Sequence, residues 1–338
     1  MNDSPSTLWP ESSRLWIRLP NWLGDVVMAL PLIRAIVTER PDLQVSLVGQ
    51  AHFMPLLGML GVGGEFHSLP KKGTRGYYRH FRQFRKERPD RYLLFTNSLR
   101  GDLEAWMTGS RQRIGMVRPG KFRPLLSDRW QVPRGLDEDQ VHQTRVWEQM
   151  LRHFGLREPL DFTPIRLPES GTTSPSSNRA PVIGLICGTE NDPSKRWPVA
   201  RWRELISMGH QRWPESRIQL FGTARDADIT RRVAADAGPQ VEDLAGKTNL
   251  VEFATALGHC ALIVCNDTGG MHIANAIGVP VAGIFGPTNP LRTGPIFNAP
   301  VSVLQAPGCP QSGGAPIDGV RVEAVLAGMS ESLSGSPG

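Results

Sequence analysis

The segment with the clearest chemical potential lies near the C-terminus, at residues 261–285. It opens with a continuous apolar run, typical of a buried parallel strand, and Asn266, Asp267 and Thr268 follow that run. These three residue types favour helix N-termini, so we expect a helix to begin there and to end at Gly278. A second apolar run then predicts another buried strand.

Two glycines at the start of this helix, Gly269 and Gly270, would let a ligand approach the backbone. The first N–H groups of a helix lack intrahelical partners, and with the helix dipole they favour an anion. The segment therefore predicts an anion site. The alternative is an ordinary strand–helix–strand unit in which the glycines serve only packing.

A pair of cations, Lys195 and Arg196, stands just before another predicted helix and shortly after Thr189, which follows a predicted strand. Positive charge at a helix start is unfavourable for the dipole, so these side chains need an anionic partner or full solvation. Solvation is usually adequate for one lysine. Two adjacent cations after a strand-end threonine favour phosphate binding.

A third strand-end loop contains Gly222, Thr223 and Asp226. An acidic side chain in this position could accept hydrogen bonds from ribose hydroxyls, by analogy with dinucleotide folds. It could equally cap the next helix. The sequence lacks a GxGxxG fingerprint after its first strand and lacks a Walker lysine motif, which counts against standard dinucleotide oxidoreductases and P-loop enzymes.

One carboxylate stands at the start of the first predicted helix, in the turn formed by Gly24 and Asp25. Its alternative role is helix N-capping, which is common. A helix N-terminus makes a carboxylate a weaker base. A weak base still suffices where the proton leaves late, as in transfer through an oxocarbenium-like state.

The most basic stretch is 71–88, where tyrosines and phenylalanines are interleaved with lysines and arginines. This composition could bind nucleic acid. Much of the stretch also has helical spacing, which would place Phe81 and Phe84 in the core and the arginines on a solvated face.

The elements that must position these residues alternate between strand and helix along the chain. We predict strands at 14–19, 44–48, 65–69, 91–95 and 111–115, followed by an irregular basic stretch at 121–130 and a helix at 139–154. After a Ser/Thr/Pro-rich linker the alternation resumes. This pattern predicts two doubly wound α/β domains, whose ligands bind at the carboxyl ends of the strands. The boundaries are a tail at 1–13, a first domain at 14–168, a linker at 169–179, a second domain at 180–316, a closing helix at 317–330 and a tail at 331–338.

The bulk composition narrows the class of protein. The 338 residues include 40% hydrophobic residues, and the net charge of +6 favours an anionic partner. Four cysteines without CxxC spacing argue against a zinc site or a disulfide framework and fit a reducing compartment. We find no apolar run long enough to span a bilayer and no Asp/His cluster spaced for metal ligation.

Several stretches together resemble the ADP-heptose:lipopolysaccharide heptosyltransferases, glycosyltransferase family 9, and most closely their heptosyltransferase II branch. They are NWLGDVVMALPLIRAI (21–36), NSLRGDLEAWMTGSRQRIGMVRPGKFRPLLSDRW (97–130), SKRWPVARW (194–202), FGTARD (221–226), LAGKTNL (244–250) and NDTGGMHIANAIGVPVAGIFGPTNP (266–290). The resemblance covers most of residues 14–295. Gly270 departs from it, because the family commonly has a larger apolar residue there.

The resemblance implies a GT-B fold, with two Rossmann-like domains facing across a cleft. The second domain would hold a nucleotide sugar and the first an acceptor. Asp25 would be the general base. The donor diphosphate would be held by Thr189, Lys195 and Arg196 and by backbone amides of Thr268, Gly269, Gly270 and Met271, with Asp267 and His272 shaping the site. Gly222, Thr223 and Asp226 would lie on the ribose and adenine side.

The expected activity is therefore inverting, metal-independent transfer of heptose from ADP-L-glycero-D-manno-heptose to the inner core of lipopolysaccharide. The acceptor would be an anionic Kdo- and heptose-bearing lipid A, met by Lys71, Lys72, Arg75, Arg100, Arg113 and Arg118. We expect no cofactor and no nucleic-acid partner, and a cytoplasmic enzyme in peripheral contact with the inner face of the membrane. The alternatives are another GT-B nucleotide-sugar enzyme with a different donor or acceptor, and a basic nucleotide- or nucleic-acid-binding protein.

Overall fold

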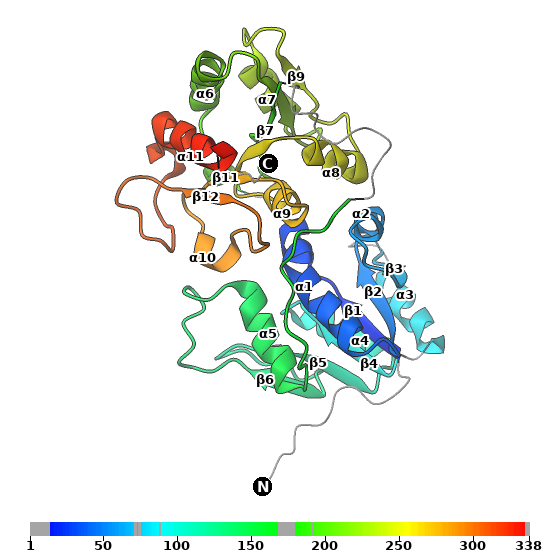
Figure 1. The fold of residues 1–338 in the computed structure, drawn as a ribbon. Coiled ribbons are helices and arrows are strands. Elements are labelled where there is room, and N and C mark those ends of the chain that lie inside the picture. The colour runs from blue at the N-terminus through cyan, green and yellow to red at the C-terminus, as the bar shows by residue number, and fades with distance from the viewer. Residues whose placement is uncertain are drawn as a thin grey trace. The chain divides into compact units, whose positions relative to one another are not determined.

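The computed structural model describes residues 14–70, 73, 76–87, 89–167, 180–190 and 192–334 (Figure 1). The chain divides into two compact units, one ending at Asp161 and the other beginning at Phe162. The expected boundary at 168 lies further along the chain. The intervening residues belong to the second unit because Ile165 N–H donates to the Ala276 carbonyl at 2.7 Å and Asn298 N–H to the Phe162 carbonyl at 2.8 Å. The predicted tail at 1–13 and linker at 169–179 lie outside the described residues.

The first unit is built on a six-stranded sheet with the strand order β3-β2-β1-β4-β5-β6, and all neighbouring strands are parallel. Its strands are β1 (Arg14–Arg18), β2 (Gln44–Gly49), β3 (Glu65–Ser68), β4 (Arg91–Leu94), β5 (Gln112–Val117) and β6 (Asp128–Gln131). Its helices are α1 (Leu23–Glu39), α2 (Met54–Met59), α3 (Tyr77–Gln83), α4 (Leu99–Met107) and α5 (Gln143–His153), with short 3₁₀ helices η1 (Ala51–Phe53) and η2 (Phe84–Lys86).

The second unit repeats this plan with the order β12-β11-β10-β7-β8-β9, again parallel throughout. Its strands are β7 (Val182–Ile186), β8 (Arg217–Phe221), β9 (Val241–Asp243), β10 (Leu262–Asn266), β11 (Val281–Ile284) and β12 (Val301–Leu304). Its helices are α6 (Val199–Arg212), α7 (Ala227–Ala234), α8 (Leu250–Gly258), α9 (Gly269–Ala276), α10 (Pro290–Thr293) and α11 (Val322–Ser334), with 3₁₀ helices η3 (Pro193–Lys195) and η4 (Ile317–Gly319).

Both sheets therefore have the doubly wound order of a nucleotide-binding fold, as the sequence predicts. The strand order reverses between β1 and β4 in the first sheet and between β7 and β10 in the second. Loops at the carboxyl ends of these strand pairs form the expected ligand edge of each sheet. The two central strands β7 and β10 are almost wholly buried, which explains why their sequences are continuous apolar runs.

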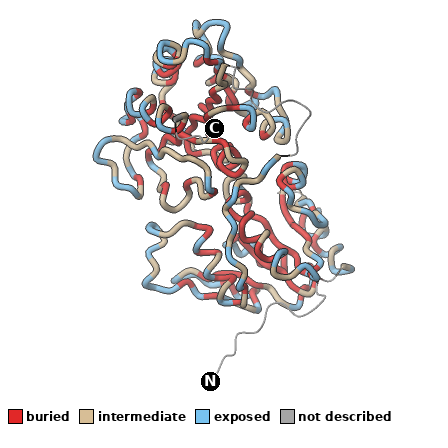
Figure 2. The backbone as a smooth tube through the Cα atoms, viewed as in Figure 1, coloured by how far each residue is buried: buried red, intermediate tan, exposed pale blue. Residues whose placement is uncertain are grey.

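Helices cover the two faces of each sheet. In the second unit α6 contacts both α7 and α11 over a core that includes strand residues, while α8 and α9 form a separate pair. In the first unit α1 packs with α5 and α3 packs with α4. The helices α1 and α9 are buried along most of their length (Figure 2). Both follow a strand at the point where the strand order reverses.

Several element boundaries differ from expectation. Helix α1 begins at Leu23, so Asp25 lies inside it, and α5 begins at Gln143 instead of 139. The stretch expected to be irregular contains the edge strand β6, whose polar sequence DRWQ carries little strand signal. The C-terminal helix begins at Val322 and continues to Ser334, so it includes part of the predicted tail. Within the described part of the chain, every helix falls short of the length and apolar character needed to cross a bilayer.

Candidate functional site

The turn between β10 and α9 has the capped geometry that its sequence predicts. Thr268 is the N-cap, with an extended backbone, and its Oγ1 accepts a hydrogen bond from Gly270 N–H at 3.1 Å. Met271 N–H donates to the Thr268 carbonyl at 3.1 Å. The expectation that these two amides point freely toward a ligand is therefore wrong in this conformation. A bound anion would share or replace these bonds, while the helix dipole remains.

A lysine and an aspartate connect the two loops at the centre of the second sheet. Lys195 Nζ lies 2.8 Å from Asp267 Oδ2, and Asp267 is 9% exposed. Strands β7 and β10 are direct neighbours, with Ile186 opposite Cys265, so the loops that follow them meet at one edge. This pair places a cationic nitrogen near the start of α9. The sequence predicted that Lys195 and the 266–270 loop act together, and the structure brings them together.

Arg196 faces the other side of the same loop. Its guanidinium donates to Thr189 Oγ1 at 3.2 Å and to the Thr189 carbonyl at 2.8 Å. Thr189 Oγ1 in turn donates to the Asp192 carbonyl at 2.8 Å. These contacts fix the shape of the loop after β7. Arg196 and Thr189 thus brace the loop that carries Lys195.

Asn266 has a role that sequence reasoning missed. It is the last residue of β10 and is fully buried, and Thr268 is the helix cap instead. The Asn266 side chain donates to the Cys187 carbonyl at 2.7 Å and accepts from Trp197 N–H at 3.1 Å. One amide therefore joins β10 to the segments on either side of Lys195. A polar residue at the end of an otherwise apolar strand is the signal that could have identified it.

The loop after β8 is closed around Asp226. Its Oδ2 accepts from Thr223 N–H at 2.9 Å and from Thr223 Oγ1 at 2.8 Å, and the residue is 6% exposed. A Cβ added at Gly188 would lie 2.1 Å from Asp226 Oδ1, and one added at Gly222 would lie 2.8 Å from Asp226 Cβ. The carboxylate therefore braces the loops after β7 and β8, which does not favour a contact with ribose. His272, on α9, is also buried.

At Gly270 the ends of two neighbouring side chains occupy the space that a Cβ would take. A Cβ at this position would lie 2.6 Å from Ile186 Cδ1 and 2.9 Å from Phe253 Cζ. Phe253 belongs to α8, and its ring packs edge-on against Phe221 with centroids 5.6 Å apart. The departure at Gly270 is thus accommodated by these two neighbouring side chains.

We expect Gly270→Ala to destabilise the protein by about 1–3 kcal/mol, because an overpacked site must shift its neighbours. Adding Phe253→Leu should restore part of the loss, since it removes one of the two obstructing groups. Gly209→Ala on α6 is the matched control: nothing lies within 4 Å of its added Cβ. That control should not destabilise the protein. Urea unfolding measures all four proteins, and equal effects of the two alanine variants would contradict the packing explanation.

In the first unit, Asp25 is the third residue of α1 and is partly buried. The N-cap position belongs to Trp22, whose side chain makes no capping hydrogen bond. The alternative that Asp25 is the N-cap is therefore wrong. A carboxylate in the first turn is favoured by the helix dipole and lies at the carboxyl edge of the sheet, beyond β1.

A buried arginine holds the loop that leads to Asp25. Arg18, at the end of β1, pairs through Nε with Glu104 Oε2 at 2.9 Å, and both side chains are at most 3% exposed. The same guanidinium donates to the Leu19 carbonyl and to Asn21 Oδ1. The Tyr77 hydroxyl donates to the other oxygen of Glu104. Burial, together with this carboxylate, raises the pKa of Tyr77 well above its ordinary value, so the hydroxyl stays protonated.

Helix α4 supplies a second buried carboxylate two residues earlier. Asp102 forms a bidentate ion pair with Arg123, and neither side chain is more than 3% exposed. Arg123 also donates to the Thr96 carbonyl at 3.1 Å, to Asn97 Oδ1 at 3.2 Å and to the Met116 carbonyl at 2.6 Å. These bonds brace the loops after β4 and β5. Sequence reasoning missed both ion pairs because charged residues are expected at the surface.

Glu104→Ala should destabilise the protein by about 3–5 kcal/mol, because it leaves the Arg18 charge buried without its partner. Urea unfolding measures the change. The control is Glu204→Ala, which breaks an exposed pair with Arg201 (3.3 Å) and should cost less than about 1 kcal/mol. A similar small loss for Glu104→Ala would show that the buried pair does not hold this region together.

The predicted acceptor residues are distributed unevenly. Arg100 is exposed at the start of α4. Arg118 follows β5 and pairs with Glu138 at 2.8 Å. Arg113 lies near the amino end of β5, on the side of the sheet away from the carboxyl-end loops. It donates to the Leu125 and Ser110 carbonyls at 2.6 and 2.7 Å, which favours a structural role. Lys71, Lys72 and Arg75 lie outside the described residues.

In the basic stretch 76–87, the structure places the phenylalanines in the core and the basic side chains on the surface, the second of the two arrangements expected from its sequence. Phe81 is fully buried and Phe84 packs edge-on against Trp16 at 5.1 Å, so these aromatic rings belong to the core. The described basic residues of the stretch are exposed, namely Arg79, Arg82, Arg85 and Lys86. Phe81 and Phe84 are therefore not available to stack on bases, whereas Tyr78 is 47% exposed.

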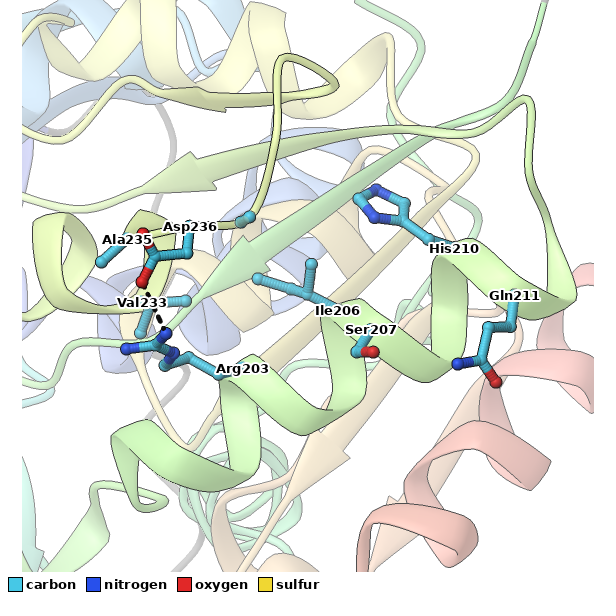
Figure 3. A pocket seen from close by; sticks show the side chains of 9 residues that line it. Arg203, Ile206, Ser207, His210, Gln211, Val233, Ala235 and Asp236 are labelled. Carbon is cyan, nitrogen blue, oxygen red and sulfur yellow. Dashed lines mark hydrogen bonds and ion pairs between the residues drawn. The ribbon is translucent and has the colours of Figure 1, made fainter.

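A cavity of about 480 Å³ lies in the second unit between α6 and the end of α7 (Figure 3). Its rim carries an ion pair between Arg203 and Asp236 at 3.1 Å. None of the predicted donor residues lines it.

The four cysteines are free, as expected, and burial raises the pKa of Cys260 to about 12, so its thiol stays protonated.

Comparison with known proteins gives a consistent picture. The sequence profile of glycosyltransferase family 9 (heptosyltransferase) matches residues 77–312. Lipopolysaccharide heptosyltransferase 2 of Escherichia coli K12 is 27% identical over 82% of this chain and 84% of its own. Among solved structures, E. coli ADP-heptose LPS heptosyltransferase II has a TM-score of 0.73 at 23% identity and covers 95% of this chain and 98% of its own. The E. coli heptosyltransferase WaaC with ADP has a TM-score of 0.74 at 19% identity and covers 94% and 99%.

Proposed function

The chain belongs to glycosyltransferase family 9, the heptosyltransferases, and from this premise we propose that it transfers heptose from ADP-L-glycero-D-manno-heptose to the inner core of lipopolysaccharide. The main structural support for this proposal is the ion pair between Lys195 and Asp267 at the start of α9. It places positive charge beside a helix N-terminus, where a diphosphate is favoured. The GT-B fold of the solved heptosyltransferases has the same architecture.

The proposed reaction is a single displacement with inversion. The acceptor oxygen attacks the anomeric carbon as the bond to the ADP oxygen breaks, and Asp25 takes the hydroxyl proton. The charge that develops on the leaving diphosphate is stabilised by Lys195 and the start of α9. Fixed donors aimed at developing charge are worth about 10²–10³ each by analogy with oxyanion holes. These groups supply the positive charge directly, so we propose that the transfer needs no metal ion.

We propose an anionic acceptor bearing Kdo and heptose on lipid A, reached by peripheral contact with the inner face of the membrane. The exposed basic residues of α3 and η2, together with Arg100, support this proposal, because exposed positive charge attracts an anionic surface. Binding to anionic vesicles should weaken as salt rises. Binding that is insensitive to salt would contradict an electrostatic contact.

The deciding experiment follows ADP release from a panel of nucleotide sugars, with lipid A acceptors that carry Kdo alone or Kdo plus one heptose. We expect release with ADP-heptose and the heptose-bearing acceptor, and proton NMR of the product should show the inverted anomeric configuration. Release from a different nucleotide sugar would assign the chain to another GT-B activity. A preference for the acceptor without heptose would contradict the proposal that the acceptor already bears heptose.

A further inference from the structure

Three side chains of the kinds that bind metal ions meet at one edge of the first sheet. Glu65 and His67 come from β3, and Glu87 directly follows η2. One ligand atom of each lies within 4.8 Å of the others. His67 Nε2 is 3.8 Å from Glu65 Oε2 and 3.6 Å from Glu87 Oε2. The cluster cannot be recognised from the sequence, because Glu87 is brought to this strand only by the fold.

The imidazole of His67 is the unusual member of the group. It is 7% exposed, and among the described residues its Nε2 has no hydrogen-bond partner. A buried polar nitrogen without a partner is unfavourable and calls for an explanation. The two carboxylate oxygens are too distant for hydrogen bonds. They are close to the separation of about 3.4 Å expected between two ligands of one tetrahedral zinc ion.

The arrangement is held in place by its surroundings. Glu65 and His67 are two residues apart in a strand, so their side chains lie on the same face of the sheet. The His67 ring stacks on Trp16, with centroids 3.9 Å apart and an angle of 27° between the planes, and Phe84 packs on it edge-on at 5.0 Å. Glu87 N–H donates to the Phe84 carbonyl at 3.0 Å. The aromatic contacts thus fix both the imidazole and the turn that supplies Glu87.

We propose that Glu65, His67 and Glu87 bind one divalent transition-metal ion, with zinc as the best match. An imidazole and two carboxylates suit zinc better than magnesium or calcium, which prefer oxygen ligands alone. A divalent ion would balance the two carboxylate charges and satisfy the buried nitrogen. Three protein ligands leave one position for water.

The role of this ion would be structural. It would link the edge strand β3 to the segment after η2, and so hold the exposed basic residues of α3 and η2 against the sheet. The three ligands gather at the edge strand β3, and β2 lies between that strand and β1, which Asp25 follows. The site is therefore separate from the residues proposed for transfer.

The test uses the full chain, stripped with a chelator and then titrated with Zn²⁺ by calorimetry. We expect wild type to bind one equivalent at this site. Glu65→Gln/Glu87→Gln and His67→Gln should bind it at least tenfold more weakly, because losing a direct ligand should cost no less than the roughly tenfold effect of losing a partner that only orients a ligand. His52→Gln, which changes an exposed histidine outside the cluster, should bind as wild type does. Zinc should also raise the Tm of wild type more than that of the double variant.

A direct readout is the nitrogen-15 NMR resonance of His67 Nε2, which should shift when one equivalent of Zn²⁺ is added. Metal-free wild type and double variant should have the same circular dichroism, which establishes that both are folded. Equal zinc affinity of wild type and the double variant, or a His67 resonance that zinc does not move, would overturn the proposal. None of these measurements uses heptose transfer, so failure here and failure of the proposed function are distinguishable.

Discussion

Replacing Asp25 with asparagine should lower turnover by about 10²–10⁴, the usual contribution of a positioned general base. Asparagine has nearly the same shape as aspartate but cannot take the acceptor proton. Asp25 lies in the first unit, whereas the proposed diphosphate site lies in the second, so ADP affinity should stay within a few-fold of wild type. Initial rates of ADP release and calorimetry with ADP measure the two quantities separately.

The matched control is Asp228→Asn, because Asp228 is also an acidic residue in the first turn of a helix, α7, and is exposed. Its replacement should leave turnover unchanged. If Asp25→Asn keeps turnover within a few-fold of wild type, another group removes the proton. A parallel loss of ADP affinity would instead show that Asp25 shapes the donor site.

Lys195→Ala should reduce kcat/KM by about 10²–10³ and weaken ADP binding by at least tenfold. The substitution removes the cation that we propose faces the diphosphate. It also leaves Asp267, a largely buried carboxylate, without the lysine that lies 2.8 Å away. An unpaired negative charge beside an anion site would repel the ligand.

This second effect has its own test. Lys195→Ala/Asp267→Asn should bind ADP more tightly than Lys195→Ala alone, since it removes the repulsion without restoring the cation. Arg203→Ala, at the rim of the cavity between α6 and α7, removes a cation elsewhere in the same unit and should leave ADP affinity unchanged. ADP affinity that survives Lys195→Ala would place the diphosphate elsewhere.

The architecture was predictable because buried parallel strands have a strong signal. β7 and β10 read as continuous apolar runs, and α8 begins with the capping box formed by Asn249 and Glu252. β6 was missed since an edge strand with one buried residue, Trp130, has no such run. The start of α1 was placed too late because Trp22 is not a capping residue type.

The arrangement of the proposed donor site was predictable in part. Lys195, Asp267 and Thr268 follow neighbouring strands, so their proximity is a consequence of the strand order. The bracing contacts of Asn266, Arg196 and Asp226 were not predictable, because hydrogen bonds between loops depend on tertiary geometry. The Arg18–Glu104 pair joins residues far apart in the sequence and contradicts the general expectation that charges are exposed.

Helix α4 carries both buried carboxylates, so it anchors the loop after β1 through Arg18 and the loops after β4 and β5 through Arg123. Detaching α4 from the sheet would release all three loops at once. They should therefore behave as one cooperative unit in native-state hydrogen exchange, with shared opening free energies. Loosening any one of these loops would then spread to the start of α1, where Asp25 lies. The alignment of Asp25 therefore depends on α4, a helix distant from it in the sequence.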